Sequence, residues 1–309
     1  MAIVPTSVPM TSEICEQTIR KLVNTYPFLE VERLTTTAFG RPIYVIEIGD
    51  GDREVLFTAA HHANEWITTP LLLKFVEELA EAFQNGGKIY GVPAKNILKY
   101  ATIHLVTMVD PDGVDLVTGA IRPQTPEYNI ARQIAGDFPD IPFPDGWKAN
   151  LLGVDLNLQY PAGWLQAREI KFSQGYDRPA PRDYVGRAPL TQKESRALAE
   201  YTEEVDPELV LAFHTQGKAI YWQFRDYVVP GARSLGEEFA RVSGYSLEDT
   251  PYESSFAGYK DWFIQNFRRP GFTIEAGIGT NPLSLAQFDE IYQDNLGILV
   301  TAATGLPEK

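Results

Sequence analysis

The chain has 309 residues, 44% of them hydrophobic, and a formal net charge of −14. This length and composition suit a folded protein with a sizeable core and exclude a disordered chain. Lys and Arg form no cluster, so we expect no nucleic-acid partner. No stretch reaches the roughly 18–20 apolar residues of a membrane helix, so we expect no membrane partner. One cysteine, Cys15, and an N-terminus without a basic, apolar leader favour a cytoplasmic location.

Apolar periodicity predicts the elements of the first half of the chain. The expected helices cover residues 12–26, with Ser12 as N-cap, and 70–83. The expected strands cover residues 41–49, 54–60 and 101–109, the last ending in a turn at 110–113. A Pro-rich, irregular region follows at about 118–188. It exceeds ordinary loop length, which is typical of functional or disordered segments.

Helices and strands continue to alternate in the second half. The expected helices cover residues 191–205, 231–244 and 282–304, and the expected strands cover 208–214 and 270–277. Thr191 and Glu194 suggest a capping box for the first of these helices. Such alternation favours a sheet covered by helices on both faces. We therefore predict an α/β fold: residues 1–309 form a single three-layer α/β/α domain around a central mixed, mostly parallel, twisted sheet.

Three predicted strand ends carry groups that bind metals or transfer protons. His62 and Glu65 follow the strand at 54–60, His214 ends the strand at 208–214, and Glu275 lies near the end of the last strand. In open α/β sheets, sites form outside the carboxyl ends of strands. A His-x-x-Glu pair with a distant histidine is a recurring ligand set for catalytic zinc, although the pair alone is a weak signal. A carboxylate in an apolar strand, such as Glu275, is costly unless paired or used.

Several motifs together resemble the M14 metallocarboxypeptidase family, which is carboxypeptidase A-like. HANEWIT (62–68) is similar to the family's zinc motif. GRPIYVIEIG lies upstream of it, and DPDG, GVDLN, FHTQ and DWFIQNFRRPGFTIEAG follow, so the resemblance covers nearly the whole chain in the family's order. HHANEWITTP, GVDLNLQYPAGW and GYKDWF look most like the bacterial branch of γ-D-glutamyl-L-diamino-acid endopeptidases. Those enzymes cut the bond between D-glutamate and a diamino acid in peptidoglycan peptides.

The resemblance implies a role for each matching residue. It implies one Zn²⁺ per chain, held by His62, Glu65 and His214. Asp155 matches the aspartate that orients the first histidine. Glu275 matches the carboxylate that activates water and acts as general base and acid. His61 is then a neighbour with a structural or supporting role, and His104, in the middle of a strand, is interpreted as structural.

The chain departs from the carboxypeptidases where they clamp the substrate's terminal carboxylate. The family's Asn-Arg pair is Asn157-Leu158 here, and leucine cannot donate a bidentate guanidinium contact. The arginine that polarises the scissile carbonyl has no obvious equivalent, and the local match WKAN leaves Lys148 or Asn150 as its replacement. The loss of the clamp counts against an ordinary C-terminal exopeptidase.

Two further substrate contacts are predicted by position. Lys260 matches the specificity pocket, where an ammonium favours a substrate carboxylate beyond the cut bond; the alternative is an exposed lysine pointing to water. The family's mobile tyrosine aligns best with Tyr252, although strict counting gives Glu253 and Tyr259 lies nearer the motif.

We therefore predict a zinc peptidase that hydrolyses the γ-D-glutamyl–diamino acid amide bond of small peptidoglycan-derived peptides (muropeptides), the diamino acid being meso-diaminopimelate or lysine. An M14-type carboxypeptidase or deacylase of acidic specificity is the alternative. A catalytically silent, zinc-stabilised muropeptide-binding protein is a remote alternative. It would require the loss of a zinc ligand or of Glu275, and none of these residues is lost.

Overall fold

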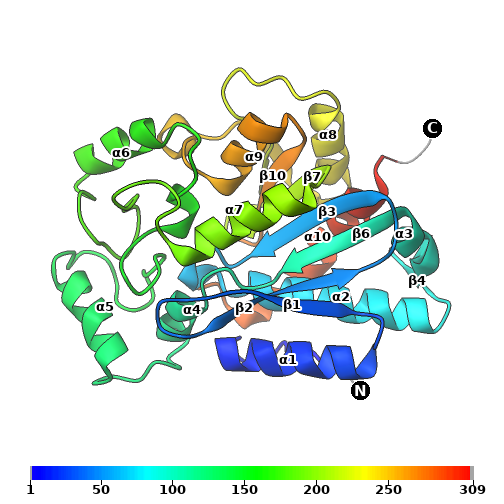
Figure 1. The fold of residues 1–309 in the computed structure, drawn as a ribbon, viewed down its shortest axis with the longest axis horizontal. Helices are drawn as coiled ribbons and strands as arrows, with labels where there is room; N and C mark the ends of the chain where they lie inside the picture. The colour runs from blue at the N-terminus through cyan, green and yellow to red at the C-terminus, as the bar shows by residue number, and fades with distance from the viewer. Residues whose placement is uncertain (1, 307–309) are drawn as a thin grey trace.

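The computed structural model of the chain describes residues 2–306. Its centre is an eight-stranded sheet in the order β1-β2-β6-β3-β7-β10-β8-β9, accompanied by a two-stranded sheet of β4 and β5 (Figure 1). The strands have these bounds: β1 Glu30–Thr36, β2 Pro42–Ile48, β3 Arg53–Ala59, β4 Lys88–Ile89, β5 Val92–Pro93, β6 Ala101–Val106, β7 Leu209–His214, β8 Ala219–Tyr221, β9 Ser246–Glu248 and β10 Gly271–Glu275.

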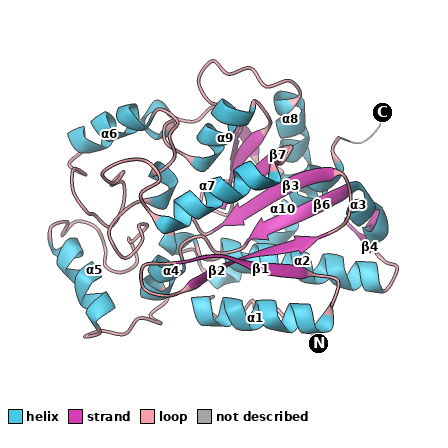
Figure 2. Cartoon of the chain, viewed as in Figure 1, coloured by secondary structure: helices cyan, strands magenta, loops and turns pink. Residues whose placement is uncertain are grey.

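Helices pack on both sides of this sheet (Figure 2). Their bounds are α1 Ser12–Thr25, α2 Thr68–Gln84, α3 Ala94–Tyr100, α4 Pro111–Val117, α5 Pro126–Gly136, α6 Trp164–Ser173, α7 Lys193–Val205, α8 Ala232–Ser243, α9 Tyr259–Phe267 and α10 Phe288–Thr304. Short 3₁₀ helices are η1 Ala63–Glu65, η2 Leu156–Leu158, η3 Tyr252–Ser254 and η4 Leu285–Gln287. Within residues 2–306, no helix combines the length and apolar character that crossing a membrane requires.

The four central strands β6, β3, β7 and β10 are parallel, and antiparallel strands flank them on both sides. Successive side chains of a strand point to opposite faces, so the continuous apolar run of β3 feeds two cores. Val55 and Phe57 pack with α1, α2, α3, α8 and α10, whereas Leu56 packs with α7 and α9 on the other face. The predicted three-layer arrangement with a mixed, mostly parallel sheet is confirmed.

Two predicted helix caps are wrong. The N-cap of α1 is Thr11, whose hydroxyl accepts from the backbone N–H of Ile14, while Ser12 donates to Asp115. Helix α7 begins at Lys193 after Gln192, and no side chain caps it. The hydroxyl of Thr191 instead donates to Oε1 of Gln159, a tertiary contact that competes with the local box.

The segment at 118–188 is more regular than its composition suggests, because it contains α5, η2 and α6. The expected turn at 110–113 is the start of α4, with Asp110 as N-cap accepting from the backbone N–H of Gly113. The last helix begins at Phe288 rather than at residue 282, after the 3₁₀ turn η4. These differences shift the ends of elements, and the predicted strands at 41–49, 54–60, 101–109, 208–214 and 270–277 correspond to β2, β3, β6, β7 and β10.

Candidate active site

Three adjacent parallel strands bring the predicted catalytic groups to one edge of the sheet. His62 follows β3, His214 ends β7, and Glu275 ends β10. In the ladder of β7 and β10, His214 lies directly beside Glu275. The carboxyl ends of parallel strands meet at the same edge, so groups more than two hundred residues apart in the chain become neighbours.

The turn after β3 aims His62 and Glu65 toward this edge. His62 has extended backbone and immediately precedes η1, which carries Glu65. The hydroxyl of Thr68 closes the turn: it accepts from the backbone N–H of Ala60 and donates to the carbonyl of Glu65. Helix α4 packs closely on η1, and a Cβ at Gly113 would come within 2.7 Å of Cβ of Ala63. A glycine is therefore required at position 113.

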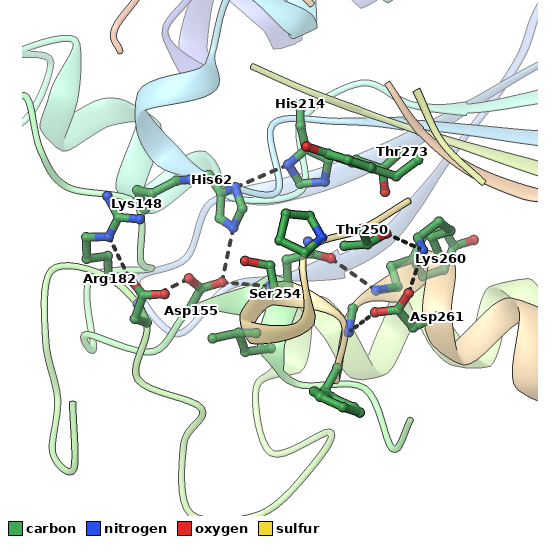
Figure 3. Close-up of a pocket in the computed structure, with 18 of the residues that line it drawn as sticks. His62, Lys148, Asp155, Arg182, His214, Thr250, Ser254, Lys260, Asp261 and Thr273 are labelled. Atoms are coloured by element: carbon green, nitrogen blue, oxygen red, sulfur yellow. Dashed lines mark hydrogen bonds and ion pairs between the residues drawn. The ribbon is translucent and has the colours of Figure 1, made fainter. Parts of the chain in front are cut away.

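The three predicted metal ligands form one buried cluster. Nδ1 of His62 lies 3.0 Å from Oε1 of Glu65, and Nδ1 of His214 lies 2.9 Å from Oε2 of the same carboxylate. The two Nδ1 atoms are 3.2 Å apart (Figure 3). The donor atoms converge within 4.8 Å of one another, and all three residues are buried. Two imidazole nitrogens and one carboxylate are a donor set that suits zinc, so the residues present fit the predicted ion.

Asp155 holds His62 from the other side of the ring. Its Oδ1 lies 3.1 Å from Nε2 of His62, which leaves Nδ1 directed at Glu65 and His214. The second oxygen, Oδ2, accepts from the backbone N–H of Asp183. Burial alone would raise the pKa of Asp155, but the contact with His62 brings it well below its ordinary value. A carboxylate on the far nitrogen of a ligand histidine fixes the ring and its tautomer.

Glu275 lies half-buried beside the cluster, and within residues 2–306 no salt bridge joins its carboxylate to a cation. Burial raises the pKa of Glu275 to about 8, and the neighbouring carboxylate of Glu65 acts in the same direction. A carboxylate with a raised pKa in a cleft is suited to accept and return protons near neutral pH.

His61 stacks on the ring of His214 with centroids 5.6 Å apart, and its Nε2 lies 3.3 Å from the hydroxyl of Tyr160. His61 therefore packs on a member of the cluster, which is consistent with the structural or supporting role considered for it. His104 lies elsewhere, between Glu54 and Tyr201, and both of its ring nitrogens contact them.

A cavity of about 220 Å³ opens at the cluster, and most of the predicted substrate contacts line it. Among the lining residues are His62, Lys148, Asp155, Asn157, Leu158, Arg182, His214, Tyr259, Lys260, Asp261 and Glu275. Asn157 is fixed there, because its Oδ1 accepts from the backbone N–H of Tyr259. Leu158 adds an apolar side chain to the wall of the cavity.

Three lysines, Lys148, Lys171 and Lys260, line the cavity, and each is ion-paired. Nζ of Lys148 lies 2.9 Å from Oε1 of Glu65. Lys260 is only 4% exposed, so it is not a lysine pointing to water: its Nζ donates to the carbonyl of Gln223 at 2.7 Å and lies 2.7 Å from Oδ1 of Asp261. Figure 3 shows Lys148 and Lys260 on opposite sides of His62 and His214.

Two predicted substrate contacts, Asn150 and Tyr252, are not among the residues that line the cavity. The Asn150 side chain is used in a turn: Oδ1 accepts from the backbone N–H groups of Leu152 and Val154, and Nδ2 donates to Gln192. Tyr252 is 70% exposed and packs edge-on against Phe256, while its neighbours Pro251 and Ser254 line the cavity.

Arg182 is a cavity residue that the sequence did not indicate. It lies between α6 and α7 in the segment RPAPRDYVG, where no motif or periodicity marks one residue above its neighbours. The only feature of the sequence that could have indicated Arg182 was an Arg-Asp pair among prolines.

The chain belongs to the zinc carboxypeptidase family, whose sequence profile matches residues 15–296. It is therefore a zinc metallopeptidase, as the motifs predicted. Its relatives include gamma-D-glutamyl-L-diamino acid endopeptidase 1 of Lysinibacillus sphaericus, which is 45% identical over 91% of this chain and 69% of that protein. Carboxypeptidase B of Rattus norvegicus is 23% identical over 85% of this chain and 62% of that protein.

Solved structures share the fold. Thrombin activatable fibrinolysis inhibitor superposes with a TM-score of 0.76 at 16% identity, over 98% of this chain and 76% of that one. Murein-tripeptide amidase MpaA of Escherichia coli O157 gives a TM-score of 0.55 at 18% identity, over 90% of this chain and 93% of that one. At these identities the likeness concerns the fold alone.

Proposed function

We propose that this protein hydrolyses the γ-D-glutamyl–diamino acid amide bond of peptidoglycan-derived peptides, and that its residues work as one peptidase domain. The observation that carries the proposal is a buried His-Glu-His cluster that opens into a cavity lined by Leu158 and Lys260. We take Leu158 to stand at the clamp position of the carboxypeptidases and Lys260 in their specificity pocket. The 45% identity to an endopeptidase named for this bond supports the proposal.

In the proposed mechanism, His62, Glu65 and His214 hold the zinc ion. When bound, zinc polarises an amide carbonyl and acidifies a water molecule. Asp155 keeps His62 in the ligating orientation through the 3.1 Å contact to Nε2.

Glu275 moves the proton. It takes one proton from the attacking water, whose oxygen bonds to the γ-carbonyl carbon, and delivers that proton to the amide nitrogen as the C–N bond breaks. The products are the γ-carboxylate of D-glutamate and the free amine of the diamino acid. The Lys148 ammonium, 2.9 Å from Glu65, places a positive charge where the carbonyl oxygen becomes negative.

The Lys260 end of the cavity receives the amine-side group. Leu158 offers no bidentate partner to a terminal α-carboxylate, whereas the Lys260 ammonium attracts a carboxylate deeper in that group. Meso-diaminopimelate has such a carboxylate on its far end, and lysine lacks it. Diaminopimelate is therefore the preferred diamino acid in this proposal.

A substrate panel with the zinc-loaded chain tests the proposal. L-Ala-γ-D-Glu-meso-diaminopimelate should be cleaved at the γ-amide, and α-linked peptides ending in a free acidic residue should not be cleaved. The opposite preference would mean a carboxypeptidase of acidic specificity. Binding of the γ-linked peptide with no turnover of any substrate would mean a silent binding protein.

A further inference from the structure

Arg182 lies at the junction of two cavities and lines both of them. It lines the cavity of the metal cluster and also a second, larger one, which it shares with Asn64, Thr215, Gln216 and Asn281. Glu275 and Lys148 line both cavities, whereas Asn157, Leu158 and Lys260 line only the first. The second cavity therefore extends from the reacting groups away from the Lys260 end.

The guanidinium of Arg182 is held by an ionic network with Asp183 and Lys171. Its Nε donates to Oδ2 of Asp183 at 2.5 Å, and Oδ1 of Asp183 lies 2.7 Å from Nζ of Lys171. The backbone N–H of Asp183 donates to Oδ2 of Asp155, the carboxylate that also contacts His62. The position of the guanidinium is thus fixed relative to the metal cluster by a short chain of contacts.

Arg182 keeps unused hydrogen-bonding capacity on the cavity side. Its side chain is 42% exposed, and within residues 2–306 no hydrogen bond engages its two terminal nitrogens. Two cations, Arg182 and Lys171, share the single carboxylate of Asp183, so these three groups together carry one net positive charge. A planar guanidinium with two free N–H edges matches a carboxylate in bidentate geometry.

Arg182 and Lys260 lie on opposite sides of the metal cluster. Figure 3 shows Arg182 and Lys148 on one side of His62 and His214, and Lys260 with Asp261 on the other. If Lys260 receives the amine-side group, Arg182 faces the acyl-side group. A γ-linked D-glutamyl residue carries a free α-carboxylate on that side, where an α-linked peptide carries an uncharged amide.

We propose that Arg182 binds the free α-carboxylate of the γ-linked D-glutamyl residue and so selects the γ-linked substrate. This inference rests on the proposed function, since it takes the acyl-side group to be D-glutamate. A hydrogen-bonded contact to a charged group contributes about tenfold to a hundredfold in selectivity. The two ends of the cavity would then each recognise one carboxylate, with the scissile bond between them.

The test compares two substrates that differ only in this charge. They are L-Ala-γ-D-Glu-meso-diaminopimelate and the same peptide with the glutamyl α-carboxylate converted to the carboxamide. For the zinc-loaded wild type, kcat/KM should be about tenfold to a hundredfold higher for the carboxylate. In Arg182→Gln this ratio should fall to about one while cleavage of the carboxamide persists, and Arg182→Lys should give an intermediate ratio.

The matched control is Arg178→Gln. Arg178 lies in the same segment, is 54% exposed and pairs with Asp177 and Asp137, and it does not line either cavity. This variant should keep the wild-type ratio. Zinc content, measured on every protein, shows whether the metal cluster is intact.

Three results would overturn the inference. The first is a wild type that cleaves both peptides equally well. The second is an Arg182→Gln protein that keeps the wild-type ratio, and the third is one that loses both activities in proportion with zinc retained, which indicates a positioning role. All three leave the proposed function standing, because the γ-amide is still cut by the wild type. A zinc-loaded wild type that cuts neither peptide refutes the proposed function and removes the basis of the inference.

Discussion

The ammonium of Lys260 lies 2.7 Å from Oδ1 of Asp261, and both side chains are buried. The lysine that the pocket offers to the substrate is therefore already ion-paired with Asp261. Asp261 is also tied to the start of α9, where its Oδ2 accepts from the backbone N–H of Gly258. A substrate carboxylate that enters the pocket competes with Asp261 for the same ammonium. We expect the selectivity from Lys260 to be limited by this competition.

Lys260→Ala should lower turnover of diaminopimelate substrates about tenfold relative to lysine substrates, because only the former carry the far carboxylate. Asp261→Asn should increase the preference for diaminopimelate substrates, since it removes the carboxylate that pairs with the Lys260 ammonium. The asparagine keeps an oxygen that accepts from the backbone N–H of Gly258. The measurement is kcat/KM on paired peptides that differ in the diamino acid. An equal loss on both peptides in Lys260→Ala would refute the pocket assignment and leave the metal cluster and Glu275 unaffected.

The wild type should contain one zinc ion per chain, bound by two histidines from separate strands and by Glu65. His62→Ala and His214→Ala should each lose the zinc and the activity, because two remaining donors do not hold the ion firmly. His104→Gln is the matched control: His104 is also buried, but its ring nitrogens contact Glu54, Tyr201 and Glu47, away from the metal cluster. Metal analysis of each purified protein gives the answer. Zinc at the wild-type level and full activity in either alanine variant would contradict the assignment.

Glu275→Gln should separate metal binding from proton transfer. Glutamine has nearly the same shape and cannot take a proton, so zinc should stay bound while kcat falls on the order of 10²–10⁴-fold. Zinc analysis and single-turnover kinetics on the same protein measure both effects. Near-full activity would place the general base on another residue.

The sequence was sufficient for the metal cluster because the pattern of strands dictates it. His214 and Glu275 each end an apolar strand and His62 closely follows a third, and parallel strands bring such ends together. Arg182 could not be found in this way, because it lies in a segment without periodicity whose course depends on tertiary contacts. The carbonyl of Gly153 and the hydrogen bonds of Gln159 hold parts of this segment, and neither contact follows a local pattern.

Features that no local sequence pattern reveals also explain the wrong predictions. Thr191 has the sequence signature of a helix cap, but Gln159 offers its hydroxyl a tertiary acceptor. Strand β1 was not predicted: it is a polar edge strand whose pairing with β2 is irregular between Arg33 and Thr35. Cytoplasmic location stays a prediction.

Glu194 gives a pH prediction that is independent of the metal. It is 2% exposed on α7, and burial raises its pKa to about 7, with Asp112 acting in the same direction. The folded protein therefore holds this proton at pH values where the unfolded chain has released it. The contribution of protonated Glu194 to the free energy of unfolding is fully present below about pH 4.5 and is lost as the pH rises through about 7.

In the wild type, the free energy of unfolding should fall by roughly 3 kcal/mol as Glu194 ionises, and Glu194→Gln should remove this decrease. Denaturant unfolding at about pH 5 and about pH 8, compared between wild type and variant, measures it. Glu200→Gln, an exposed position on the same helix, is the control and should leave the pH dependence unchanged. Parallel stability curves for wild type and Glu194→Gln would mean that Glu194 titrates normally.

Mass spectrometry of the products from L-Ala-γ-D-Glu-meso-diaminopimelate tests the central claim most directly. The zinc-loaded protein should release L-Ala-D-Glu and free diaminopimelate, and Glu275→Gln with full zinc should leave the peptide intact. Cleavage at the bond between alanine and glutamate would contradict the assignment of the γ-amide as the scissile bond. An intact peptide after incubation with wild-type protein carrying one zinc per chain would contradict the proposed activity.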